Sequence, residues 1–255
     1  MEIIIEPDYD GVCERACGVV KDALAANPSL VLGLATGRTP VGLYERLRQA
    51  NLRWSKVRFF NLDELYGVGP DHPESFHHFL RKHLLDHLDA DPAHVKLLRG
   101  DVKNLEEAAD GYEKAIAEVG GIDLQILGVG NNGHIAFNEP GSSLGSRTRP
   151  KTLTDETLAQ YRTPGKEPVS NFALTMGVGT IMEAKRLLMM VSGASKAGVV
   201  RDFVEGPLTA EVPASILQLH PRAVVVLDEA AASKLKRRDY YKWVFANKWR
   251  VGQKQ

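Results

Sequence analysis

The sequence predicts a single α/β domain with a largely parallel sheet flanked by helices, a Rossmann-like arrangement. Short apolar runs rich in β-branched residues recur along the 255 residues, and each leads through a turn into a stretch with helical periodicity. The runs are apolar on both faces, which is typical of parallel strands covered by helices on each side. No internal repeat or low-complexity linker divides the chain, so one domain is the economical interpretation.

Predicted strands and helices alternate along the chain. The clearest strands are Val31–Leu34, Val57–Phe60, Leu124–Val129, Leu187–Val191 and Ala223–Leu227. The clearest helices are Leu43–Leu52, Phe76–Leu88 and Leu105–Val119. Loop-like composition is concentrated in Glu139–Thr148 and Thr163–Ser170. We therefore expect one domain over residues 1–255, with a lid or loop insertion around 139–170.

Composition narrows the classes of function. Lys+Arg and Asp+Glu are equal at 32 each, so we expect neither nucleic acid nor a membrane surface as a partner. The N-terminus lacks the pattern of a signal peptide, and no apolar run approaches the length of a membrane span. The only cysteines, Cys13 and Cys17, are interpreted as buried thiols rather than a metal or redox pair. A cytoplasmic protein without structural disulfides is expected.

A candidate anion site follows the first predicted strand. Ligands bind beyond the carboxyl ends of strands in open parallel sheets. The segment Thr36-Gly37-Arg38-Thr39 stands at such an end, and Pro40 can open the next helix. Backbone N–H groups at a helix start favour an anion, although the ending of a Walker loop is missing. A plain helix cap is the alternative.

A second glycine-rich turn would also suit a dinucleotide-binding enzyme. Residues 128–133 read Gly-Val-Gly-Asn-Asn-Gly and formally match the dinucleotide fingerprint after a strand. That fingerprint should open a helix and lead to a ribose-binding acid about twenty residues on. Here the turn runs into His-Ile-Ala-Phe-Asn-Glu-Pro, and Pro140 limits any helix. A nicotinamide-dependent enzyme is therefore disfavoured.

Candidate acid–base groups also follow strand ends. Asp63 and Glu64 are adjacent, so on an extended backbone they point to opposite sides. One can face a pocket while the other caps a helix or pairs with a base. His134 precedes Glu139 by five residues in a turn-rich segment, where the carboxylate could fix the imidazole tautomer. The alternative for His134 is a structural residue.

Six of the eight histidines fall between His72 and His94. His83 and His87 have i,i+4 spacing on a predicted helix, which would suit a metal. However, no HExxH motif is present, and Lys and Arg interleave with the histidines. We interpret this run as a solvated helix face and expect no metal.

Several longer segments match a known family. They are LGLATGRTPVGLY, FFNLDELYGV with HPESF, ILGVGNNGHIAFNEPGSSLGSRTRPKTL, ALTMGVGTIMEA and LQLHPRAVVVLDE. On these the chain resembles glucosamine-6-phosphate deaminases, from about Leu30 to about Leu235. Their wider group includes 6-phosphogluconolactonases and shares an architecture with ribose-5-phosphate isomerase. The segment GHIAFNEP is the most specific, because lactonases do not normally continue Phe-Asn-Glu-Pro after the histidine.

The resemblance implies a catalytic domain that converts glucosamine 6-phosphate to fructose 6-phosphate and ammonia. Asp63 matches the base that moves a proton between C2 and C1, and His134 matches the residue that opens the sugar ring. Glu139 matches the carboxylate that supports this histidine. The phosphate contacts carry over to Thr36, Gly37, Arg38, Thr39, Lys196 and, across a one-residue gap, Arg162. No organic cofactor is expected, because the reaction has no redox step.

Two positions depart from the family pattern. Asn132 stands where many members have Asp, and an amide can position a neighbour without stabilising an imidazolium by charge. Arg38 replaces a second glycine of the phosphate loop, either adding a cation for the phosphate or pointing to solvent. We expect the Asn132 difference to change the pH profile rather than abolish activity.

Some family members are hexamers activated by N-acetylglucosamine 6-phosphate. The residues resembling that effector site are Ser142, Arg149, Lys151 and Thr152. Subunit packing or a lid is the alternative role for this loop. The C-terminal segment shows little of the hexameric pattern, so a homo-oligomer and an effector are both left open. Rival reactions are lactone hydrolysis and deamination of galactosamine 6-phosphate, and a non-catalytic sugar-phosphate sensor is a third alternative.

Overall fold

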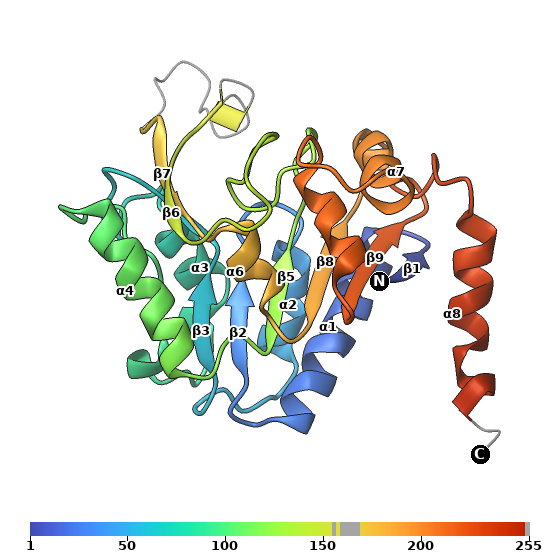
Figure 1. Cartoon of the computed structure of the whole chain (residues 1–255). Coiled ribbons are helices and arrows are strands. Elements are labelled where there is room, and N and C mark those ends of the chain that lie inside the picture. The colour runs from blue at the N-terminus through green and yellow to red at the C-terminus, as the bar shows by residue number, and fades with distance from the viewer. Residues whose placement is uncertain (155–156, 159–168, 253–255) are drawn as a thin grey trace.

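The structure is a computed structural model that describes residues 1–154, 157–158 and 169–252 (Figure 1). Six parallel strands form the central sheet. In spatial order they are β1 (Glu2–Glu6), β9 (Ala223–Asp228), β8 (Leu187–Val191), β5 (Leu124–Leu127), β2 (Val31–Leu34) and β3 (Arg58–Asn61). Every residue of β2, β5, β8 and β9 is buried, which explains why these runs lack polar alternation.

Helices pack on both faces of this sheet (Figure 1). They are α1 (Tyr9–Ala26), α2 (Val41–Gln49), α3 (Phe76–His83), α4 (Leu105–Glu118), α6 (Val178–Met182), α7 (Ala197–Glu205) and α8 (Arg238–Gly252). Short 3-10 segments are η1 (Leu85–His87), η2 (Pro92–His94), η3 (Ala194–Lys196) and η4 (Pro213–Leu219). Polar side chains begin several helices, as at Asn104, whose Oδ1 accepts from Glu106 N at 3.1 Å. No helix of the described chain combines the length and apolarity needed to cross a bilayer.

A second, antiparallel sheet has the order β4 (Asp63–Leu65), β7 (Phe172–Thr175) and β6 (Arg149–Thr152). β4 begins two residues after the end of β3, so this sheet lies beyond the carboxyl ends of the parallel strands (Figure 1). It packs on an apolar cluster of its own, separate from the main core, made of Leu65, Val68, Phe76, Phe137, Leu153, Leu158 and Ala173. Residues 63–65 therefore connect the two layers directly.

The strand order places a topological switch point next to β2. From β2 the chain continues outward to β3, whereas β5 lies on the opposite side of β2. Ligands bind at such a switch point, outside the carboxyl ends of the strands. The loops after β2 and β5 therefore flank the expected site.

The predicted fold class is confirmed, and all five predicted strands form with ends shifted by at most two residues. The sequence reading missed β1 and the whole small sheet. β1 reads Glu-Ile-Ile-Ile-Glu and is short, and β6 reads Arg-Pro-Lys-Thr without an apolar pattern. Strands of this kind form because tertiary partners pair with them, and local periodicity does not reveal that.

Candidate active site

The loop after β2 presents unused backbone donors. None of the N–H groups of residues 36–39 donates a hydrogen bond to any residue that the structure describes. Gly37 adopts φ 105°, a conformation that favours glycine and turns the chain before α2. Consecutive free N–H groups before a helix form a concavity that attracts anions. The predicted anion site therefore has the required geometry.

Two tyrosines hold this loop. Tyr44 on α2 donates its hydroxyl to Ala35 O at 2.5 Å and accepts from Ala35 N at 3.2 Å. Tyr9 at the start of α1 donates to Thr39 O at 3.0 Å and accepts from Gly42 N at 2.9 Å. Sequence reasoning missed both, because each contact depends on how helices pack across the sheet.

Two cations lie beside the loop. Lys196 donates from Nζ to Val129 O at 2.8 Å, which brings its ammonium to the end of β5. Burial lowers the pKa of Lys196, and the nearby charge of Arg38 lowers it further. Arg38 itself is exposed. Since Lys196 and Arg38 are close enough to repel, an anion between them would be stabilised. Arg162 lies outside the described residues.

Asp63 and Glu64 have opposite environments. The Glu64 carboxylate accepts from Leu65 N, Ser75 Oγ, Phe76 N and His77 N at 2.7–2.9 Å. It therefore caps the start of α3, which confirms one of the roles that the sequence left open. No described residue donates a hydrogen bond to the Asp63 carboxylate, although this side chain is buried. Burial, followed by the charge of Glu64, raises the pKa of Asp63 to about 8.

The main chain at Asp63 is fixed by a buried network. Asn61 donates from Nδ2 to Asp63 O at 2.7 Å. Tyr112 on α4 holds Asn61 in turn, donating to Asn61 O and accepting from Asn61 N, both at 2.8 Å. Asp63 is therefore a carboxylate that accepts no hydrogen bond from the described residues, on a backbone fixed by its neighbours, which is what a positioned base requires.

The loop after β5 presents His134. Gly130 N donates to His134 O at 2.9 Å, and Gly133 adopts φ 88° to close the turn. A Cβ on Gly130 would stand 2.2–2.4 Å from three atoms of the imidazole. The ring therefore rests directly against the glycine backbone. His134 is 7% exposed, so its environment is nearly dry.

Glu139 faces this imidazole. Its Oε2 lies 3.5 Å from His134 Nδ1, longer than a normal hydrogen bond but within ion-pair distance. Asn132 Nδ2 donates to the same oxygen at 2.7 Å, and Thr157 Oγ1 donates to Oε1. Burial acts to raise the pKa of Glu139, but His134, Thr157 and Asn132 together lower it to about 2. A charged carboxylate therefore stands beside the histidine throughout the neutral range.

The groups are connected at one edge of the fold. Asp63 pairs with Thr175 on β7, and Thr175 Oγ1 accepts from Phe137 N at 3.1 Å, between His134 and Glu139. Lys196 contacts Val129, directly before the His134 turn. The predicted phosphate and acid–base residues that the structure describes thus lie around the carboxyl ends of β2, β3, β5 and β8.

Three of the four predicted effector residues lie on the small sheet. Arg149, Lys151 and Thr152 belong to β6, and Ser142 is buried in the loop after Glu139. Arg149 Nη1 donates to Asn138 Oδ1 at 2.9 Å, and burial lowers its pKa. Nothing in the described chain assigns a ligand to these residues.

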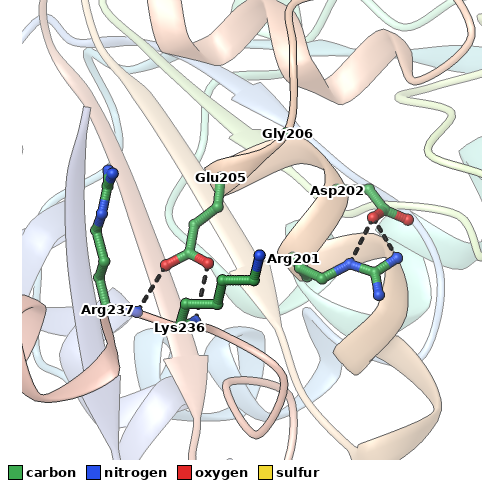
Figure 2. Close-up of a pocket in the computed structure, with 6 residues that line it drawn as sticks. All are labelled: Arg201, Asp202, Glu205, Gly206, Lys236 and Arg237. Carbon is green, nitrogen blue, oxygen red and sulfur yellow. Dashed lines mark hydrogen bonds and ion pairs between the residues drawn. The ribbon is translucent and has the colours of Figure 1, made fainter.

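A surface pocket of about 290 Å³ between α7 and α8 has different chemistry (Figure 2). Its Glu205 accepts from Lys236 N at 2.8 Å and Arg237 N at 2.9 Å. Its Arg201 is paired with Asp202. These carboxylates are occupied in structural contacts, so the pocket offers no free base. We assign it a structural role at the start of α8.

Comparisons with known proteins agree with this geometry. Residues 9–226 match the family model described as glucosamine-6-phosphate isomerases/6-phosphogluconolactonase. The chain is 47% identical to a glucosamine-6-phosphate deaminase of Shewanella woodyi, over 96% of each chain. It is 45% identical to glucosamine-6-phosphate deaminase 2 of Bacillus subtilis, over 92% of this chain and 98% of that one.

Solved structures give the same picture. A monomeric glucosamine-6-phosphate deaminase superposes with a TM-score of 0.89 at 38% identity, covering 92% of this chain and all of that one. A 6-phosphogluconolactonase from Trypanosoma cruzi superposes with a TM-score of 0.75 at 24% identity, covering 92% and 97%. The lactonase likeness shows a shared fold and nothing more.

Proposed function

Because the chain belongs to the glucosamine-6-phosphate isomerase/6-phosphogluconolactonase family, we propose that it is a glucosamine-6-phosphate deaminase. It converts glucosamine 6-phosphate and water to fructose 6-phosphate and ammonia. The observation that carries this proposal is Asp63, a buried carboxylate with no hydrogen-bond donor among the described residues and a pKa raised to about 8. Lactone hydrolysis has no use for such a base, whereas moving a proton between two sugar carbons requires one.

The phosphate anchors the substrate. Free N–H groups of residues 36–39 bind its oxygens, and Arg38 and Lys196 balance its charge. The phosphate then holds the sugar so that its reacting carbons meet the acid–base groups, which lowers the entropic part of the barrier.

His134 opens the pyranose ring. It takes the proton from the anomeric hydroxyl and returns a proton to the ring oxygen, giving the open-chain aldehyde. An imidazole suits both steps near neutrality. Glu139, charged and 3.5 Å away, stabilises the imidazolium that forms between them.

Asp63 carries out the isomerisation. As a carboxylate it removes the proton from C2 and returns it to C1, while one proton of the C2 ammonium passes to O1, so that the aldehyde becomes the C1 hydroxyl and an imine is left at C2. Water adds to this imine, and ammonia leaves as the C2 ketone of fructose 6-phosphate forms. The substrate ammonium lowers the pKa of Asp63 on binding, since an opposite charge favours the ionised carboxylate. The reaction moves protons and water without net electron transfer, so it requires no redox cofactor.

The segment around 139–170 acts as a lid over this site, and Ser142, Arg149, Lys151 and Thr152 take a second phosphorylated sugar. What supports the lid is β6, which belongs to the small sheet beyond the carboxyl ends of the main strands (Figure 1).

The deciding experiment supplies purified protein with glucosamine 6-phosphate, galactosamine 6-phosphate and 6-phosphogluconolactone in separate reactions. Release of both ammonia and fructose 6-phosphate from the gluco substrate is expected. Turnover of the lactone alone would overturn the proposal, and turnover of the galacto epimer alone would overturn the substrate assignment. If the protein binds the sugar phosphates but turns over none of the three substrates, it is a non-catalytic sensor.

A further inference from the structure

Asp228 ends β9 and gathers hydrogen bonds from two separate turns. Its carboxylate accepts from Ser192 Oγ and, at 2.9 Å, from Gly193 N in the turn that follows β8. It also accepts from Ala231 N at 2.7 Å in the turn that follows β9. The side chain is 5% exposed. This carboxylate takes no part in the proton transfers proposed above.

A relay of hydrogen bonds leads from Asp228 to Lys196. Gly193 N donates to Asp228, and Lys196 N donates to Gly193 O at 3.0 Å. Lys196 Nζ then reaches Val129 O at 2.8 Å. Gly193 adopts φ 97°, which glycine takes up readily, but glycine is also the most flexible residue, so contacts from outside the turn are needed to hold it in one conformation. Asp228 provides that support three residues before the lysine.

We infer that Asp228 is a positioning residue for Lys196 and thereby sets the affinity of the site for phosphate. The inference rests on the proposed function in one respect, the assignment of Lys196 to the substrate phosphate. Without the carboxylate, the turn at Gly193 loses its fixed geometry. The Lys196 ammonium then no longer has a single position beside the anion loop, residues 36–39. Phosphate binding then weakens, while His134 and Asp63 keep their places on other loops.

The carboxylate matters as an acceptor. Three donors converge on it, from Ser192, Gly193 and Ala231. An amide of the same shape accepts with its one oxygen only. In Asp228→Asn that oxygen has to serve both Gly193 N and Ala231 N, while the new N–H group faces the Ser192 hydroxyl. The substitution keeps the volume, removes the charge and weakens the hold on the Gly193 turn.

Glu205 provides a matched control at the opposite end of α7 (Figure 2). Like Asp228, it is a carboxylate that accepts two backbone N–H groups, those of Lys236 and Arg237. None of its hydrogen bonds in the described chain involves Lys196. Glu205→Gln therefore weakens two comparable backbone hydrogen bonds and leaves the contacts of Lys196 in place.

The test measures binding of inorganic phosphate by isothermal titration calorimetry and, separately, kcat and KM for glucosamine 6-phosphate. For Asp228→Asn we expect phosphate affinity to fall about tenfold and KM to rise by about the same factor, with kcat changed by less than about twofold. Glu205→Gln should leave all three values unchanged. In an Asp228→Asn/Lys196→Ala double variant, phosphate affinity should fall no further than in Lys196→Ala alone, because both changes remove one interaction.

The outcomes separate the inference from the proposed function. Wild-type phosphate affinity in folded Asp228→Asn would overturn the inference, as would additive losses in the double variant. If Asp228→Asn does not fold, Ser192→Ala removes one hydrogen bond to Asp228, and a loss of about threefold in phosphate affinity is expected. An unchanged affinity there would overturn the inference. Failure of the unsubstituted protein to release ammonia would overturn the proposed function alone, because the titration needs no turnover.

Discussion

Asn132 donates a hydrogen bond from Nδ2 to Glu139 Oε2 at 2.7 Å, on the same oxygen that faces His134 Nδ1. Its own Oδ1 accepts from His134 N at 3.2 Å, which fixes the orientation of the amide. Asn132 therefore holds the charged partner of the histidine without adding a charge. Among the described residues, the one carboxylate within ion-pair distance of this imidazole is that of Glu139.

Asn132→Asp should change the pH dependence of the reaction. The new carboxylate cannot donate to Glu139 and repels it, so the pKa of Glu139 rises and a protonated His134 is favoured. We expect the acid limb of kcat/KM to move upward by about one pH unit. Superimposable profiles for the variant and the unsubstituted protein, measured between pH 5 and 9, would contradict this.

Asp63→Asn should abolish turnover and stabilise the fold in alkaline solution. Folded Asp63 has a pKa of about 8 against an ordinary value of 3.8. Between these values the folded protein keeps a proton that the unfolded chain has released, so the free energy of unfolding falls as pH rises. Asparagine has no such dependence. Relative to the unsubstituted protein, the variant should gain at least about 2 kcal/mol between pH 5 and pH 9, since one pKa unit is worth about 1.4 kcal/mol.

Urea denaturation at the two pH values measures this change. Glu64→Gln is the control, because four donors surround that carboxylate and an amide cannot accept from all of them. It should lose about 2 kcal/mol at pH 5 and less at pH 9, because the pKa of Glu64 is itself raised and its charge contributes to the raised pKa of Asp63. If the free energy of unfolding of Asp63→Asn changes between pH 5 and pH 9 as it does in the unsubstituted protein, Asp63 does not have a raised pKa and the prediction is wrong.

Substitution of two buried tyrosines by Phe should affect different kinetic constants. Tyr112→Phe leaves Asn61 without its partner and loosens the backbone of Asp63, so we expect kcat to fall about tenfold with KM nearly unchanged. Tyr44→Phe releases Ala35 at the anion loop, so KM should rise and kcat should hold. Steady-state measurements of kcat and KM for Tyr112→Phe and Tyr44→Phe test this difference. The prediction is wrong if both substitutions change only kcat or only KM.

Gly130→Ala should displace the His134 ring. A Cβ at Gly130 would stand 2.2–2.4 Å from imidazole atoms, closer than any stable contact, whereas nothing lies within 4 Å of a Cβ at Gly128. We expect Gly130→Ala to lower kcat/KM at least about a hundredfold, as displacements of catalytic groups by about 1 Å do. Gly128→Ala, two residues away, should retain most activity. Comparable losses in both would indicate a general effect on the loop.

The sequence predicted the parts of this molecule that depend on local pattern. The strand ends at Leu34 and Val191 could be identified because fully buried parallel strands are apolar throughout. The opposite roles of Asp63 and Glu64 followed from strand alternation, although which of them caps a helix needed the position of α3.

Contacts between distant segments could not be predicted in this way. Tyr112 meets Asn61 across 51 positions, and no periodicity in either segment indicates that contact. The hydroxyl of Thr157 reaches Glu139 because the chain returns over the site, which a local pattern does not encode. Asp228 did carry a signal, since it follows a predicted strand, but its partners lie on the neighbouring strand end.

Thr175 is the register partner of Asp63 on one side and of Arg149 on the other. The proposed base and a cation of the candidate effector site are thus neighbours across a single strand, while the loop proposed to bind phosphate follows β2 of the other sheet. A ligand that shifted β6 would move Thr175 and, through it, the backbone of Asp63. We expect such a ligand to act on the turnover rate through this one strand.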